Sequence, residues 1–144
     1  MDAVVSRQLV AKGTLVTKRI LVIDDREELL ALLRMILEDE RYQVSVLREG
    51  QGAIERIRAE QPDLVILDLR LEDASGVDVL QSLRAHTGTA DIPVIVYTAA
   101  VIEAEAVSRL IKSEPARYGN VVVLQKPFDL DALLDHVQQV LGAA

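Results

Sequence analysis

Four short, largely aliphatic runs in this chain each end at a polar side chain. The runs cover residues 20–23, 64–67, 94–97 and 121–125. The residues that follow them are, in the same order, Asp24 with Asp25, Asp68, Thr98 and Lys126. Runs of Ile, Leu and Val predict strands buried on both faces, as in a parallel sheet. Because ligands bind beyond the carboxyl ends of such strands, we expect these polar residues to converge on one edge.

Apolar residues at helical spacing separate these runs. The spacing predicts helices over residues 27–39, 52–60, 76–85, 102–112 and 130–141, and further strand pattern extends over 43–47 and 92–97. Ser75 and Asp129 occupy expected N-cap positions, while Pro62 and Pro115 end the second and fourth helices. Five strands alternating with five helices predict an α/β sandwich whose parallel strands are joined by right-handed crossovers.

The composition favours one soluble, cytoplasmic domain with an aliphatic core. The chain has 144 residues, 50% hydrophobic but only 3% aromatic, and no cysteine for disulfide or thiol chemistry. Its net charge of −7 repels nucleic-acid phosphates and anionic lipid, so neither is an expected direct partner. No run approaches the roughly 18 apolar residues of a membrane span. We interpret residues 1–18 as an N-terminal arm or short appended helix without secretory-signal features, and 19–144 as the domain.

The polar residues at the strand ends form a set that suits phosphoryl chemistry. Taken one at a time, each Asp is as readily explained as a helix cap or turn residue. Together, clustered carboxylates repel one another, by roughly 4 kcal/mol at about 4 Å and an effective dielectric of about 20, and so need a cation. Oxygen ligands in this number suit Mg²⁺. An Asp carboxylate can attack phosphorus, while a Lys ammonium and a Thr hydroxyl can contact the phosphoryl oxygens.

Residues 19–142 resemble a receiver domain of the two-component response regulators. The motifs that carry the resemblance are Asp24-Asp25, Asp68, Ser75-Gly76, Thr98-Ala99 and Lys126-Pro127-Phe128. The family fold is flavodoxin-like, with a five-stranded parallel sheet of order 2-1-3-4-5 and five helices on its two faces. This fold agrees with the architecture that the hydrophobic pattern predicts.

The resemblance implies a phosphoacceptor and a metal site. Asp68 would receive a phosphoryl group from a histidine kinase or a histidine phosphotransfer protein. Asp25 and Asp68 would bind Mg²⁺ directly, and Asp24 would bind it through water. The backbone carbonyl of Arg70 would complete the protein ligands. The Arg70 side chain is either a solvated rim residue or a group that screens the attacking water.

The resemblance also implies a switch, from which this sequence departs. Lys126, on a cis Lys126–Pro127 peptide, would pair first with Asp68 and then with the phosphoryl group, and Thr98 would be the switch hydroxyl. Val123 stands where the family usually has an aromatic residue, so the coupled movement lacks its usual partner. The segment 113–120 is longer than usual and is expected to form a loop after Pro115. It is either a tolerated insertion or an altered partner surface.

Three functions remain open at this point. The first is a stand-alone receiver, or a piece of a longer regulator, that is not a metabolic enzyme and catalyses only its own phosphotransfer and slow dephosphorylation. Phosphorylation would shift the population between two states of one face, formed by residues 102–112, 121–125 and 130–141. This shift would control contacts with an output protein or a second copy. The second is a Mg²⁺-dependent phosphohydrolase with an aspartyl-phosphate, disfavoured because Arg26 stands where its Asp-x-Asp pattern needs Asp. The third is a receiver-like scaffold that works without phosphorylation, which Val123 motivates.

Overall fold

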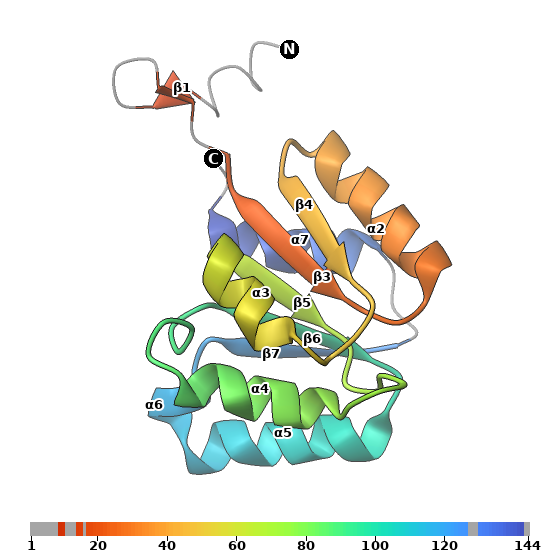
Figure 1. Ribbon diagram of the computed structural model, residues 1–144, viewed down its shortest axis with the longest axis vertical. Helices are drawn as coiled ribbons and strands as arrows, with labels where there is room; N and C mark the ends of the chain where they lie inside the picture. Colours follow the sequence, from red (N-terminus) through yellow and green to blue (C-terminus); the bar gives the residue numbers. More distant parts are fainter. Residues whose placement is uncertain (1–8, 11–13, 16, 127–129, 143–144) are drawn as a thin grey trace.

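The computed structural model describes residues 9–10, 14–15, 17–126 and 130–142. Its main element is a five-stranded sheet in which all neighbouring strands are parallel. In spatial order the strands are β4 (Gln43–Leu47), β3 (Arg19–Ile23), β5 (Leu64–Leu67), β6 (Val94–Thr98) and β7 (Val121–Gln125). Numbered along the sheet-forming part of the chain, this order is 2-1-3-4-5, which confirms the predicted flavodoxin-like topology (Figure 1).

The register of the strands brings their carboxyl ends to one edge. Ile23 at the end of β3 is paired with Leu67 at the end of β5. Backbone bonds continue past the strand ends: the N–H of Asp68 donates to the carbonyl of Ile23 at 2.9 Å, and that of Lys126 donates to the carbonyl of Thr98 at 2.8 Å. The sheet backbone itself therefore positions the polar residues at this edge.

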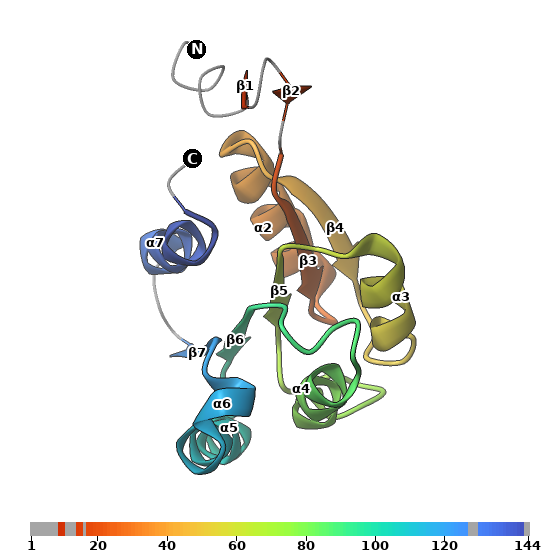
Figure 2. The same cartoon turned by 90° about the vertical axis from the view of Figure 1, so that its left-hand side faces the viewer.

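Helices cover both faces of the sheet. On one face lie α2 (Glu27–Asp39) and α7 (Leu130–Leu141), and on the other lie α3 (Ala53–Glu60), α4 (Gly76–Ala85) and α5 (Val101–Ser113) (Figure 2). A separate apolar cluster fills each side. Alternate residues of a strand enter opposite clusters, so that Val96 of β6 packs on the α3–α5 side and Tyr97 on the α2–α7 side.

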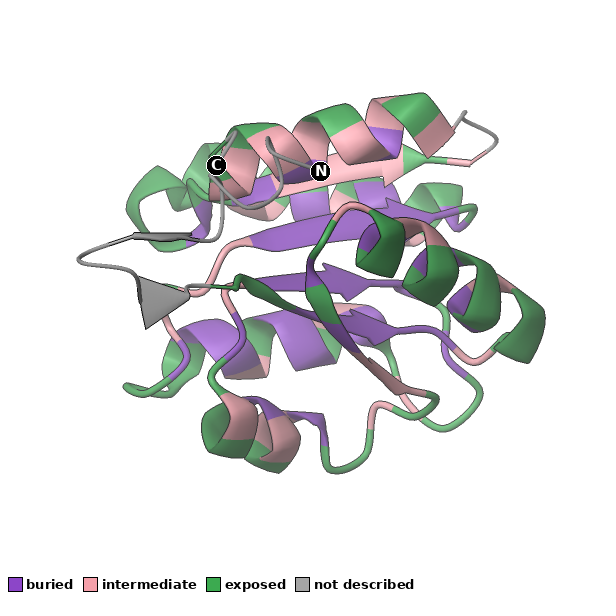
Figure 3. Cartoon of the chain, turned by 90° about the horizontal axis from the view of Figure 1, so that it is seen from above, coloured by how far each residue is buried: buried purple, intermediate pink, exposed green. Residues whose placement is uncertain are grey.

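The core is aliphatic, as the composition predicts. All residues of β5 are at most 1% exposed, and the burial colouring shows the central strands enclosed by helices that are exposed on their outer faces (Figure 3). Burying one such Leu, Ile or Val side chain contributes about 1.5–3 kcal/mol. The sheet is therefore a rigid platform for the residues at its edge.

The helix and strand predictions agree with the structure, apart from a few boundaries. The predicted helices 27–39, 76–85 and 130–141 have the observed bounds. The strand predicted over 92–97 runs from Val94 to Thr98 instead, because Pro93 has no N–H for the ladder and the N–H of Ile92 closes a turn onto Thr89. Ser75 is the N-cap of α4 by position, although its side chain makes no capping hydrogen bond.

The expectation of a loop over 113–120 was wrong, because this segment contains a sixth helix, α6 (Pro115–Tyr118). Pro115 stands in its first turn, where the missing N–H breaks no hydrogen bond. The carbonyl of Glu114 accepts the N–H groups of Arg117 and Tyr118, both at 3.0 Å. Tyr118 is 2% exposed and packs into the α3–α5 cluster. The additional residues are thus anchored to the core.

The N-terminal segment contains two short strands, β1 (Leu9–Val10) and β2 (Thr14–Leu15), which pair in an antiparallel manner. The alternative of a short helix was therefore wrong for these residues. Two other predictions, the Asp129 cap and the cis Lys126–Pro127 peptide, involve residues 127–129 and lie outside the described residues. Within the described part of the chain, no helix has the length and apolar character needed to cross a bilayer.

Candidate functional site

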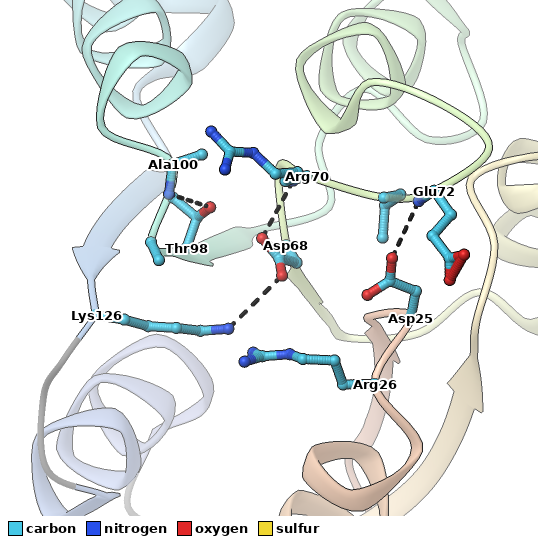
Figure 4. Close-up of a pocket in the computed structure, with 10 residues that line it drawn as sticks. Asp25, Arg26, Asp68, Arg70, Glu72, Thr98, Ala100 and Lys126 are labelled. Carbon is cyan, nitrogen blue, oxygen red and sulfur yellow. Dashed lines mark hydrogen bonds and ion pairs between the residues drawn. The ribbon is translucent and has the colours of Figure 1, made fainter.

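The predicted site residues come together at the carboxyl edge of the sheet (Figure 4). A cavity of about 330 Å³ opens there between the segments that follow β3, β5, β6 and β7. The residues that line it include Asp25, Asp68, Thr98 and Lys126, together with Arg26, Arg70, Glu72 and Ala100. Asp24 is buried beside this group, with 2% of its surface exposed.

Lys126 is the main cation of the cavity. Its Nζ lies 3.6 Å from Oδ2 of Asp68 and 3.7 Å from Oδ2 of Asp24. The ammonium also lies 4.3 Å from the ring centroid of Tyr97, which adds a cation–π contact. These contacts hold the Lys126 ammonium over the phosphoacceptor candidate.

The surroundings of Asp68 favour the protonated form of its carboxyl group. Burial raises the pKa of the Asp68 carboxyl above its usual 3.8, and the charge of Asp24 raises it further. The N–H of Arg70, which donates to Oδ1 of Asp68 at 3.2 Å, and the Thr98 hydroxyl act in the opposite direction. A further cation at this carboxylate would lower the free-energy cost of keeping it charged while buried.

Thr98 is fully buried, with an exposed fraction of 0%. Its Oγ1 accepts the N–H of Ala100 at 3.0 Å, and that bond ties the hydroxyl to the residue that precedes α5. The hydroxyl therefore links the cavity to the start of a helix.

Asp24 is fully engaged by cations and N–H groups. Oδ1 accepts the backbone N–H of Arg26 at 2.9 Å, and the Arg26 guanidinium lies 3.4 Å from each carboxylate oxygen. Lys126 contacts Oδ2 as well. From the sequence, Arg26 was considered only as the residue that breaks the Asp-x-Asp pattern of a phosphohydrolase. Its contact with Asp24 was missed, because the direction of a side chain does not follow from its position after Asp25.

The donors at the cavity fit Mg²⁺, although they are not gathered around a common point. No group of three or more His, Cys, Asp or Glu side chains is placed to hold a metal ion within the described ranges. Asp24 faces Arg26 and Lys126, while Oδ2 of Asp25 accepts the N–H of Glu72 at 3.0 Å. Mg²⁺ keeps several waters and takes one or two carboxylates, so Asp25 and Asp68 supply a suitable pair of ligands.

The segment between β5 and α4 is fixed by contacts that the sequence pattern does not indicate. Asp73 accepts the N–H groups of Gly50 and Gln51 at 2.9 and 2.8 Å, and these bonds lower the pKa of its carboxyl. A Cβ atom on Gly76 would lie 2.4 Å from the Cα of Leu69. The Ser75-Gly76 motif is therefore explained by close backbone approach beside the phosphoacceptor candidate.

The rim of the cavity carries an ion pair. Nη2 of Arg70 lies 3.6 Å from Oε1 of Glu103 on α5, with 71% of the arginine side chain exposed. In Figure 4 the Arg70 guanidinium points away from the Asp68 carboxylate. This placement agrees with the interpretation of Arg70 as a rim residue.

Several other predicted residues lie outside the cavity. Val123 on β7 is paired with Val96 and packs against the α3–α5 cluster. Tyr97 lies on the other face of the sheet and so does not replace the absent aromatic residue. His86 is exposed, and neither it nor His136 lines the cavity.

The comparisons with known proteins define the class of protein. A family model described as the response regulator receiver domain matches residues 20–138. The match covers most of the chain, which therefore belongs to the response regulator receiver domain family. The chain is 39% identical to the DNA-binding response regulator MtrA of Mycolicibacterium smegmatis over 82 residues, and 39% identical to the transcriptional regulatory protein KdpE of Mycobacterium tuberculosis over 115.

These relatives are longer than the chain. The matches cover 57% and 80% of this chain, but 35% of MtrA and 47% of KdpE. The chain thus spans less than half the length of either relative. Among solved structures, the receiver domain of the sensor histidine kinase PA1611 from Pseudomonas aeruginosa matches with a TM-score of 0.71 at 21% identity, over 88% of this chain and 99% of that one. That structure holds a magnesium ion in its active-site cleft.

Proposed function

We propose that this chain is a phosphoacceptor module that receives a phosphoryl group on Asp68 from a histidine kinase or a histidine phosphotransfer protein. The observation that carries the proposal is the buried Asp68 carboxylate, which faces the Lys126 ammonium at 3.6 Å across an open cavity. Thr98, at the same edge, supplies a hydroxyl. This combination is the one that acyl-phosphate chemistry requires.

In the transfer, a carboxylate oxygen of Asp68 forms a bond to phosphorus as the bond between phosphorus and the donor imidazole nitrogen breaks. The electron pair of that bond returns to the imidazole. Lys126 then exchanges its contact with Asp68 for one with a phosphoryl oxygen. The chain releases the group only by slow hydrolysis or by passing it on, so it does not turn over small phosphate esters.

Asp25 and Asp68 would hold Mg²⁺ with the carbonyl of Arg70, and Asp24 would contribute through water. The bound ion would neutralise charge on the transferring group and on Asp68. The chain's own contribution is to keep these carboxylates close together: the Glu72 N–H fixes Asp25, and the Arg70 N–H fixes Asp68.

The signal would leave the site through the face of α5, β7 and α7. When Thr98 turns to the phosphoryl group, its Oγ1 releases the N–H of Ala100 and frees the start of α5 to move. Val101 and Ile102, the first residues of that helix, are 56% and 76% exposed and would contact an output protein or a second copy. Because Val123 stands where the family usually has an aromatic residue, no aromatic side chain at that position can move together with Thr98. We therefore expect the change to reach α5 through the hydrogen bond between Thr98 and Ala100.

The test is to incubate the protein with acetyl phosphate and Mg²⁺ and to record its intact mass. The expected result is a mass gain of one phosphoryl group. No gain should occur when a chelator removes Mg²⁺ before the donor is added. Asp68→Asn should abolish the gain, while Asp73→Asn, a matched change in the same segment, should retain it. A mass gain that survives in Asp68→Asn would contradict the assignment, and no gain in any variant would favour the unphosphorylated scaffold.

A further inference from the structure

Tyr97 lies beside Lys126 without belonging to the carboxylate cluster. It directly precedes Thr98 on β6, is 7% exposed, and packs in the apolar cluster on the α2–α7 side of the sheet. Nζ of Lys126 lies 4.3 Å from the centroid of its ring. The three residues before Tyr97 on β6 are Val, Ile and Val, so the ring is the exception in an aliphatic run.

The register of the sheet brings this ring and the lysine together. Tyr97 of β6 is paired with Leu124 of β7, and both side chains belong to the α2–α7 cluster. Lys126 stands two residues after Leu124, and its N–H continues the ladder by donating to the carbonyl of Thr98. Since side chains alternate along a strand, Lys126 leaves the sheet on the same side as Leu124, diagonally opposite Tyr97. A ring one residue earlier or later would lie on the other face.

The other contacts of the Lys126 ammonium are ion pairs that are too long to be hydrogen bonds. Its Nζ lies 3.6 Å from Asp68 and 3.7 Å from Asp24, whereas a charged N–H···O bond is about 2.7–2.9 Å long. Because lysine has a flexible four-carbon stem, such contacts define the direction of the ammonium only loosely. The face of an aromatic ring attracts a cation within about 6 Å, more strongly when water is excluded. The Lys126 side chain is 13% exposed, so the ring contact is largely shielded from water.

The ring attracts the ammonium without adding charge to the site. Asp24, Asp25 and Asp68 already place three carboxylates at this edge of the sheet, and a fourth would repel an incoming phosphoryl group. Burial raises the pKa of the Tyr97 hydroxyl above its usual 10.0, so the residue stays neutral at physiological pH. The ring can therefore hold the lysine while the ammonium keeps its charge for the phosphoryl oxygens.

We infer that Tyr97 is a positioning residue for the proposed phosphotransfer: its ring holds the Lys126 ammonium beside Asp68, where the phosphoryl group arrives. The inference rests on the proposed function and deepens it. Tyr97 acts through Lys126, on the side of the sheet where its ring is packed among aliphatic side chains. Without the ring, the ammonium spends more of its time away from Asp68, and transfer becomes slower although the fold is intact.

The contact itself is tested by NMR on the metal-free protein without any phosphodonor. The chain has four lysines, so isotope-labelled lysine gives few signals, and Lys126→Arg identifies those of Lys126. The ring current of Tyr97 should shift the ε-methylene protons of Lys126 upfield of those of the other lysines. Tyr97→Phe should keep this shift because the ring remains, whereas Tyr97→Leu should abolish it. A Lys126 signal at the position of the other lysines in the wild type would overturn the inference.

The positioning role is tested by the rate at which acetyl phosphate and Mg²⁺ phosphorylate each variant, followed by intact mass. Tyr97→Leu should slow this rate about three- to ten-fold, as expected for loss of a partly desolvated cation–π contact. Tyr97→Phe should bring the rate back to within about two-fold of the wild type. Tyr42→Leu is the matched control, because Tyr42 is also 7% exposed in the same apolar cluster, and it should change neither the rate nor the lysine shift.

The outcomes separate positioning from packing and from the proposed function. A wild-type rate in Tyr97→Leu, or equal losses in Tyr97→Leu and Tyr97→Phe, would overturn the inference. An equal loss in Tyr42→Leu would also overturn it, because the effect would then come from packing. If the wild type shows the lysine shift but takes up no phosphoryl group, the proposed function fails, and the placement of Lys126 by Tyr97 stands.

Discussion

At the Asp68 edge of the sheet, Lys126 contacts both Asp24 and Asp68, Arg26 contacts Asp24, and Asp25 lines the same cavity. At the opposite end, Arg84 is buried with two of its nitrogens unpaired. The first region gathers its charged groups around an open cavity, whereas the second encloses a guanidinium whose Nη2 is bonded to Asn120. Buried charge at the carboxyl edge of the sheet is thus accessible from the cavity, whereas the unpaired nitrogens of Arg84 are enclosed by the fold.

The largest expected difference between the two ends is in how their backbones tolerate an added side chain. A Cβ on Gly76 would meet the Cα of Leu69 at 2.4 Å and the carbonyl oxygen of Asp68 at 2.5 Å, and backbone atoms cannot move aside cheaply. Gly76→Ala should therefore lower the free energy of unfolding by about 2–3 kcal/mol, measured by urea denaturation. Gly88, in the segment near Arg84, has nothing within 4 Å of such a Cβ, so Gly88→Ala is the matched control. Equal effects of the two changes would refute this account of the Ser75-Gly76 motif.

A second prediction concerns the cost of the Asp68 charge in the metal-free protein. Burial makes the pKa of Asp68 higher in the folded chain than its usual 3.8, so the folded state binds more protons between the two values. The free energy of unfolding should then fall as the pH rises through that window. Asp68→Asn should remove this fall and be more stable than the wild type at neutral pH, with the advantage shrinking towards acid.

Denaturation curves of both proteins across pH, with a chelator present, measure this difference. A variant less stable than the wild type at neutral pH would show that Lys126 and the N–H donors compensate the Asp68 charge fully. The cavity would then not need a further cation.

A smaller effect, on Mg²⁺ affinity, is expected from a change at Arg26. Its guanidinium contacts Asp24 and lines the cavity together with Asp25 and Asp68. Because a positive charge beside the carboxylates opposes entry of a metal ion, Arg26→Gln should tighten Mg²⁺ binding about two- to five-fold in calorimetry. Arg34→Gln makes the same charge change on α2, where Arg34 pairs with Glu38, and should have little effect. Weaker Mg²⁺ binding by Arg26→Gln would mean that the guanidinium organises the carboxylates and does not compete with the ion.

The two ends also differ in how far the sequence predicts them. The Asp68 edge follows from strand periodicity, because the end of a buried run fixes where the next residue lies: Asp68 and Lys126 are both bonded to a neighbouring strand by their own backbone N–H groups. The hydrophobic pattern is therefore sufficient to predict the topology and the convergence of these residues. The direction of the Arg26 side chain could not be predicted, since it is set by contacts with both oxygens of Asp24 that leave no pattern in the sequence.

The Arg84 end could not be predicted, for a different physical reason. Nothing in the spacing of α4 distinguishes a buried Arg84 from a solvated one, and its hydrogen bond to Asn120, which follows α6, joins segments 36 residues apart. That helix begins at a proline that periodicity alone indicates as a helix end. Contacts between segments distant in the sequence decide both the burial of Arg84 and the formation of α6. Such contacts leave no local pattern in the sequence.

The most direct test of the central claim is to identify the residue that carries the phosphoryl group. The protein would be incubated with a phosphorylated histidine phosphotransfer protein and Mg²⁺, treated with borohydride to reduce the acyl phosphate, and digested for peptide sequencing. We expect the reduced residue to be Asp68, with no other carboxyl group modified. Modification at Asp24 or Asp25 would contradict it, because a nucleophile after β3 would indicate the chemistry of an aspartyl-phosphate phosphohydrolase.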